Sequence, residues 1–90
     1  MDARQRLMRV DDVFELADRV VLAPGVDGEQ SRGLVGRSVS LERPDGTLVS
    51  TTVASVELPS PNPSQRYPIA LGGSLTKQDV PIGTEVWLDE

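Results

Sequence analysis

Residues 36–46 read Gly-Arg-Ser-Val-Ser-Leu-Glu-Arg-Pro-Asp-Gly, and this stretch carries the clearest fold signal in the chain. Val39 and Leu41 alternate with polar residues, which is the period of a strand with one buried face. The Arg-Pro-Asp-Gly run is typical of a hairpin turn, because proline presets φ and glycine accepts a positive φ. Residues 48–58 then predict the return strand of a β-hairpin.

Short β-rich segments with glycine and proline corners lie on both sides of this hairpin. We expect further strands over residues 10–16, 19–24, 67–71 and 84–88, and loops over residues 27–31 and 59–66. The second loop holds three prolines, which exclude a central strand. One short helical turn is expected near residues 76–80. The sequence therefore predicts an all-β fold, a small closed six-stranded antiparallel barrel.

The length of 90 residues indicates a single domain. Residues 1–9 show no core pattern and are expected to be a flexible N-terminal segment, with one β-barrel domain over residues 10–90. Only three aromatic residues are present, so the core is expected to consist of valine, leucine and isoleucine.

The residue types exclude several kinds of chemistry. The chain has no cysteine and no histidine, which removes disulfides, the commonest general base and the usual transition-metal ligands. It also has no Gly-x-x-x-x-Gly-Lys-[Ser/Thr] phosphate loop, so GTP hydrolysis is excluded. No apolar run is long enough to span a membrane, and no secretory signal is present. We expect a cytoplasmic protein with no enzymatic activity, no cofactor and no metal.

The charge is unevenly distributed along the chain. Residues 11–90 hold six basic and thirteen acidic side chains, for a balance of −7. Nucleic-acid binders usually present a basic stripe, because phosphate neutralisation supplies most of their affinity. RNA is therefore a disfavoured partner, and a protein partner is expected.

Several motifs follow one another in the order of a known barrel. Residues 11–16 read Asp-Asp-Val-Phe-Glu-Leu, with Arg19 and Gly25 after them, and residues 52–57 read Thr-Val-Ala-Ser-Val-Glu. The run Leu-Gly-Gly-Ser-Leu-Thr-Lys-Gln-Asp-Val-Pro-Ile-Gly ends at residue 83. Over residues 10–88 the chain resembles the second, β-barrel domain of elongation factor Tu and related translational GTPases. The resemblance implies a translation-type barrel without its GTPase domain.

The positions where this chain departs from the family's pattern weaken the inference of the family's function more than the inference of its fold. The acidic pair Asp11 and Asp12 is retained. The family's Gly-Arg-Gly signature is Asp18-Arg19-Val20 here, so the arginine is kept and both glycines are replaced. In elongation factor Tu this barrel helps to bind the aminoacyl end of tRNA through the acidic pair and an asparagine stretch. Here that stretch is replaced by Arg66 and Tyr67 before Pro68.

Five residues are therefore candidates for binding a ligand or partner: Asp11, Asp12, Arg19, Arg66 and Tyr67. Adjacent carboxylates on a strand point to opposite faces, so a structural role for the acidic pair is favoured over metal binding or catalysis. Arg19 is expected to pair with an acid at the barrel rim. Arg66 and Tyr67 are residue types enriched at interface hot spots, although a rigid connector is the simpler interpretation of their loop.

The favoured function is a non-catalytic binding module, acting as an adaptor or regulatory domain for a protein partner. The alternative is an accessory domain that binds the end of a tRNA or another RNA. An enzyme using Asp11, Asp12 and Lys77 is the least favoured interpretation.

Overall fold

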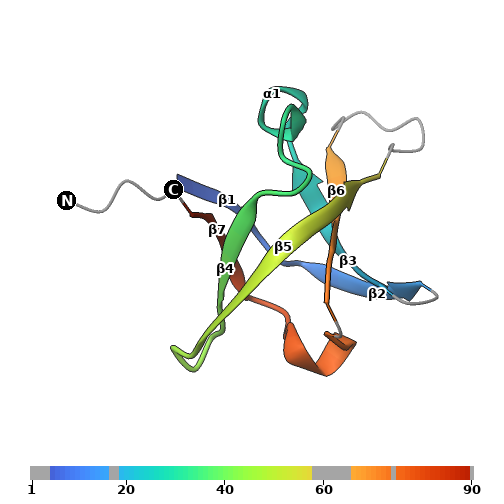
Figure 1. The fold of residues 1–90 in the computed structure, drawn as a ribbon. Helices are drawn as coiled ribbons and strands as arrows, with labels where there is room; N and C mark the ends of the chain where they lie inside the picture. Colours follow the sequence, from blue (N-terminus) through green and yellow to red (C-terminus); the bar gives the residue numbers. More distant parts are fainter. Residues whose placement is uncertain (1–4, 17–18, 58–65, 74, 90) are drawn as a thin grey trace.

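The computed structural model describes residues 5–16, 19–57, 66–73 and 75–89. Within them, strands form one curled antiparallel sheet in the order β1-β7-β4-β5-β6-β3-β2 (Figure 1). The strands are β1 (Gln5–Arg9), β2 (Asp12–Leu16), β3 (Arg19–Val26), β4 (Ser38–Glu42), β5 (Leu48–Val56), β6 (Tyr67–Leu71) and β7 (Glu85–Leu88). The all-β prediction is confirmed.

The predicted closed six-stranded barrel is wrong, because the described residues form seven strands in an open, half-barrel sheet. β1 and β2 are the two edge strands and form no ladder with each other. The chain passes directly from one edge to the other: Val10 N donates to Thr84 O at 2.8 Å, and Asp11 N donates to Ala23 O at 2.9 Å. The segment expected to be one strand over residues 10–16 bends at this point, so the residue before the bend and the residues after it pair with different neighbours.

The prediction that residues 1–9 are flexible is corrected for Gln5–Arg9, which form β1 and pair with β7. Leu7 and Met8 are both buried although they are adjacent. A register shift between Arg6 and Met8 accounts for this, because it breaks the strict alternation that normally marks a half-buried strand. Residues 1–4 lie outside the described part of the chain.

The concave face of the sheet holds a core of aliphatic side chains. Its fully buried members come from nearly every strand, and the largest are Leu22, Leu41, Ile69 and Leu71, with Val10, Val13, Val20, Val26, Val39, Val53, Val80 and Val86 around them. This composition agrees with the predicted valine, leucine and isoleucine core.

Two short helical elements lie at opposite ends of the sheet (Figure 1). The helix α1 (Gly28–Ser31) replaces the loop expected over residues 27–31, because Asp27 and Gln30 form a capping box. The 3-10 turn η1 (Lys77–Asp79) lies within the helical turn predicted near residues 76–80. The β4–β5 hairpin is also as predicted, with Gly46 N donating to Arg43 O at 2.8 Å.

Candidate functional site

The five residues singled out in the sequence lie at the beginnings of β2, β3 and β6 or just before them, but they do not meet. Asp11 and Asp12 stand at the start of β2, Arg19 begins β3, and Arg66 and Tyr67 stand at the start of β6. Tyr67 is the ladder partner of Val26, at the opposite end of β3 from Arg19. At about 3.3 Å per strand residue, these two ends are about 20 Å apart. The five side chains therefore do not form one pocket.

The acidic pair is exposed to solvent. Asp12 Oδ1 accepts a hydrogen bond from Val13 N at 2.9 Å, which ties this carboxylate to its own strand. Asp11 precedes the strand, and its backbone N–H bonds to Ala23 of β3. The pair thus supplies negative charge at the beginning of an edge strand.

Arg19 pairs with an acid, as the sequence predicts. Its Nη1 donates to Ser55 Oγ at 3.1 Å and lies 3.8 Å from Glu57 Oε2. Ser55 Oγ in turn donates to Glu57 Oε2 at 2.7 Å. The network crosses from β3 to the end of β5, and because both charged side chains remain partly exposed it contributes little to stability.

Tyr67 has a structural position. Its side chain packs against the core cluster, and its ring lies close to Gly28 of α1. It therefore links β6 to the helix. Arg66 is exposed beside it. The proline-rich loop expected over residues 59–66 lies largely outside the described residues, which resume at Arg66.

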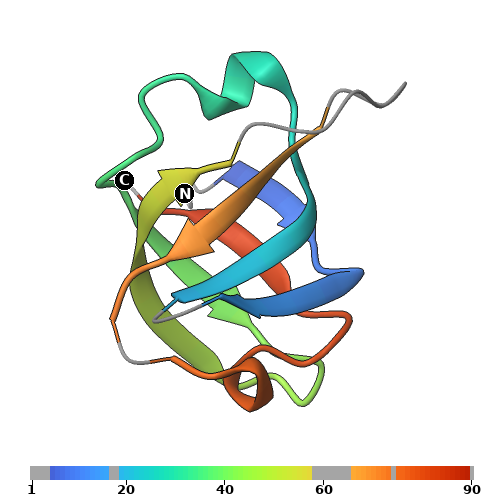
Figure 2. The ribbon, with the colours of Figure 1, turned by 90° about the vertical axis from the view of Figure 1, so that its right-hand side faces the viewer.

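A more extended feature lies on the convex face of β2, β3 and β6, and we call it the β2 face: Phe14, Leu16, Val21 and Ala70. Phe14 and Leu16 are 46% and 51% exposed. Phe14 is the ladder partner of Val21, and Val21 is the partner of Ala70. Val21 and Ala70 are 4% and 0% exposed, yet neither belongs to the core cluster. Figure 2 shows the three strands side by side on the face toward the viewer.

The sequence carried a signal for this face that the prediction did not use. The run Val20-Val21-Leu22 is apolar without interruption, which is typical of a strand buried on both sides. In β2, Val13 faces the core, so Phe14 and Leu16 must point outward. Together these patterns indicate an apolar convex surface.

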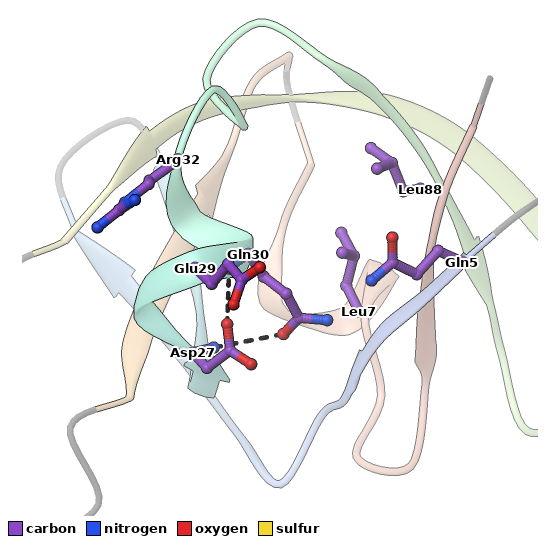
Figure 3. A pocket seen from close by; sticks show the side chains of 7 residues that line it. All are labelled: Gln5, Leu7, Asp27, Glu29, Gln30, Arg32 and Leu88. Carbon is purple, nitrogen blue, oxygen red and sulfur yellow. Dashed lines mark hydrogen bonds between the residues drawn. The ribbon is translucent and has the colours of Figure 1, made fainter.

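The described structure has open hollows on its surface, two of which are well defined. The larger, of about 430 Å³, lies between α1 and the paired ends of β1 and β7 (Figure 3), and is lined by Gln5, Leu7, Asp27, Glu29, Gln30, Arg32 and Leu88. Asp27 and Gln30 are engaged there in the capping box, with Gln30 N donating to Asp27 Oδ1 at 2.6 Å. The smaller, of about 270 Å³, is lined by Arg19, Ala54, Leu71, Gly72 and Gly73. Both are open to solvent and mix polar with apolar groups.

Two carboxylates hold the turn η1 in place: Glu15 joins it to β2, and Asp79 closes the turn itself. Lys77 N donates to Glu15 Oε2 at 2.9 Å, and Thr76 N donates to Asp79 Oδ2 at 2.7 Å. The backbone and hydroxyl hydrogen bonds from Thr76 lower the pKa of Asp79, with the Arg43 guanidinium adding a smaller effect in the same direction.

We expect Asp79→Ala to destabilise the domain near neutral pH and to lose this effect in acid. Because folding lowers the pKa of Asp79, its carboxylate stabilises the fold fully above the ordinary value of 3.8. That contribution disappears as the pH falls through the lower folded-state pKa. Urea denaturation of both proteins at about pH 7 and about pH 3 measures the difference between their midpoints. A difference that stayed constant with pH would contradict this role for the carboxylate.

The described residues contain no group of three or more acidic side chains placed to hold a metal ion. None of their helices is long and apolar enough to cross a bilayer.

Comparison with known proteins adds no relative: no protein-family model, no curated protein and no solved structure matches this chain.

Proposed function

We propose that this domain is a non-catalytic module that binds a protein partner, as an adaptor or regulatory domain. The observation that carries the proposal is the β2 face. Phe14 and Leu16 are half exposed there, two residues apart on β2, and the neighbouring Val21 and Ala70 of the same face are buried. Contiguous apolar surface on a small domain marks an interaction site more often than scattered exposed leucines do.

The surroundings of the β2 face suit a protein interface. Interfaces place aromatic and aliphatic side chains at the centre and polar groups at the rim. Phe14 is the aromatic residue of this face. The exposed Asp12 lies on the same strand, and the Arg19–Glu57 ion pair joins the start of β3 to the residue after β5. Arginine and aromatic residues are also enriched among hot spots.

RNA-end binding is the second proposal, and it has less support. The acidic balance of residues 11–90 opposes binding to a phosphate backbone. Arg19, one of the cations on these strands, is engaged with Ser55 and Glu57. The resemblance to the second domain of elongation factor Tu stays a proposal about the scaffold. A cytoplasmic setting is proposed with it, since a chain without cysteine does not depend on an oxidising compartment.

The test compares two pairs of exposed side chains. We expect the variant Phe14→Ser/Leu16→Ser to lose the partner that the wild type captures from the source cell, with enrichment falling about thirtyfold if the pair forms a hot spot worth about 2 kcal/mol. The control variant is Val35→Ser/Leu48→Ser, which removes side chains that are 58% and 60% exposed elsewhere on the molecule. Quantitative mass spectrometry of cross-linked captures gives the enrichment of each protein.

The outcomes separate the two proposals. Equal capture by both double variants and the wild type would refute a protein-binding β2 face. Salt-sensitive recovery of tRNA in place of a protein would support RNA binding instead. Thermal denaturation of each variant, together with Leu16→Ser alone, shows that a loss of capture does not arise from unfolding.

A further inference from the structure

The β2 face ends at an edge strand. β2 is the last strand of the sheet order, and its described ladder partner is β3 alone. Contacts with η1 are made through the Glu15 side chain, which accepts from Lys77 N, and not through a backbone ladder. The outer backbone groups of β2 therefore have no strand beside them in the described residues. An unpaired edge of this kind is a template for an added strand.

The two edges of the sheet differ in the side chains that they expose. β1 buries its apolar Leu7 and Met8 and exposes Arg6, which forms an ion pair with Glu85 at 2.6 Å. β2 instead exposes apolar Phe14 and Leu16. Charged edges discourage pairing with another chain, whereas an apolar flank supplies side-chain contacts to a new strand. β2 is therefore the edge suited to a partner.

Charge favours one occupant of this edge over another. Asp11, Asp12 and Glu15 are all exposed along β2, which carries no basic residue. A second copy of the chain, pairing β2 with β2, would bring two such acidic edges together. Like charges on neighbouring strands are destabilising, whereas opposite charges across a strand pair are favourable. The complementary occupant is a strand with basic side chains.

We infer that β2 accepts an extended, basic segment of a partner protein as an additional strand of the sheet. This inference rests on the proposed function and specifies how the partner is bound. The backbone of the segment pairs with the outer edge of β2. Its basic side chains lie near Asp11 and Glu15, and its apolar side chains, on the other face of the added strand, extend the surface begun by Phe14 and Leu16.

The probe is a synthetic peptide that alternates lysine with valine. Its matched control is the same peptide with alternate backbone nitrogens methylated, which keeps the charge and removes the donors that a ladder needs. Amide hydrogen exchange followed by NMR reports on β2, and fluorescence anisotropy gives the affinity. We expect the unmodified peptide to slow exchange of the outward-facing β2 amides at least about tenfold, and the methylated peptide to leave them unchanged.

Two single substitutions test the contribution of charge. Asp11→Asn is expected to weaken binding of the unmodified peptide about threefold, the usual size of an exposed ion pair. Glu29→Gln removes an exposed carboxylate in α1, where Glu29 lines a hollow together with residues of β1 and β7, and is expected to leave the affinity unchanged. Raising the salt concentration should remove the difference between the wild type and Asp11→Asn.

Four results would overturn the inference. These are equal affinity for the two peptides, no measurable binding of the unmodified one, protection of β1 in place of β2, and protection of β2 by self-association without peptide. None of them bears on the capture experiment with Phe14→Ser/Leu16→Ser. If that variant loses its partner while the peptide leaves β2 unprotected, the β2 face remains the binding site and the added strand is wrong.

Discussion

Replacing Gly25 with alanine is expected to cause the largest loss of stability of any single substitution considered. Gly25 has a φ of +103°, and a Cβ atom built there would overlap the Tyr67 carbonyl group and lie 2.5 Å from Pro68 N. These are backbone atoms of β6, which is held to β3 through the Val26–Tyr67 pair, so they cannot move aside without breaking the ladder. We expect a loss of about 4 kcal/mol or more, against a total stability of about 4–13 kcal/mol for a domain of this size.

Gly33→Ala is the matched control for this substitution. Gly33 also has a positive φ, of +69°, but nothing lies within 4 Å of an added Cβ. Its replacement carries the conformational cost alone, about 1 kcal/mol. Urea denaturation followed by circular dichroism measures both variants. Similar losses in the two proteins would mean that the close approach of β3 and β6 at Gly25 does not restrict this position.

Leu22→Ala is expected to cause the second largest loss, about 3 kcal/mol. Leu22 is 0% exposed and lies in the middle of β3, between Val13 of β2 and Ile69 of β6. Shortening it removes buried apolar surface and leaves a cavity that three paired strands cannot readily close. A loss of this size lowers the melting temperature by about 12–24 °C in a domain of this length.

The control for the core substitution is Leu48→Ala, which shortens the same residue type at a 60% exposed position. A change within about 0.5 kcal/mol is expected there. Guanidinium denaturation gives the free energy of unfolding of both variants, together with its dependence on denaturant concentration. Comparable losses at the two positions would show that β3 does not pack as described.

The strands that the sequence predicts well are those with a local signal. Val39 and Leu41 alternate with polar residues, and the Pro44–Gly46 turn fixes where the chain reverses, so β4 and the β4–β5 hairpin follow from short-range chemistry. Ile69 and Leu71 lie in a short apolar segment bounded by proline and glycine, and β6 is found as expected. In these places the alternation that marks the buried face and the residues that mark the turn indicate the same strand boundaries.

What could not be predicted depends on long-range register. Leu7 and Met8 are buried because β1 bulges against β7, at the other end of the chain, and no local alternation indicates this. The Arg19–Glu57 contact likewise joins residues whose neighbourhood is set by the β3–β6–β5 order. The Val20-Val21-Leu22 run indicates that β3 is apolar on its convex face. Which strands lie beside it there can be known only from the strand pairing of the folded sheet.

The pairing of β1 with β7 has a consequence for engineering. Gln5 and Leu88 are ladder partners, so the points where the described chain enters and leaves the domain are neighbours, with Cα atoms about 5 Å apart. A domain whose entry and exit points are adjacent can be inserted into a surface loop of a host protein without moving the two ends of that loop apart. This sheet could therefore serve as an insertable cassette, displaying β2 at its opposite edge.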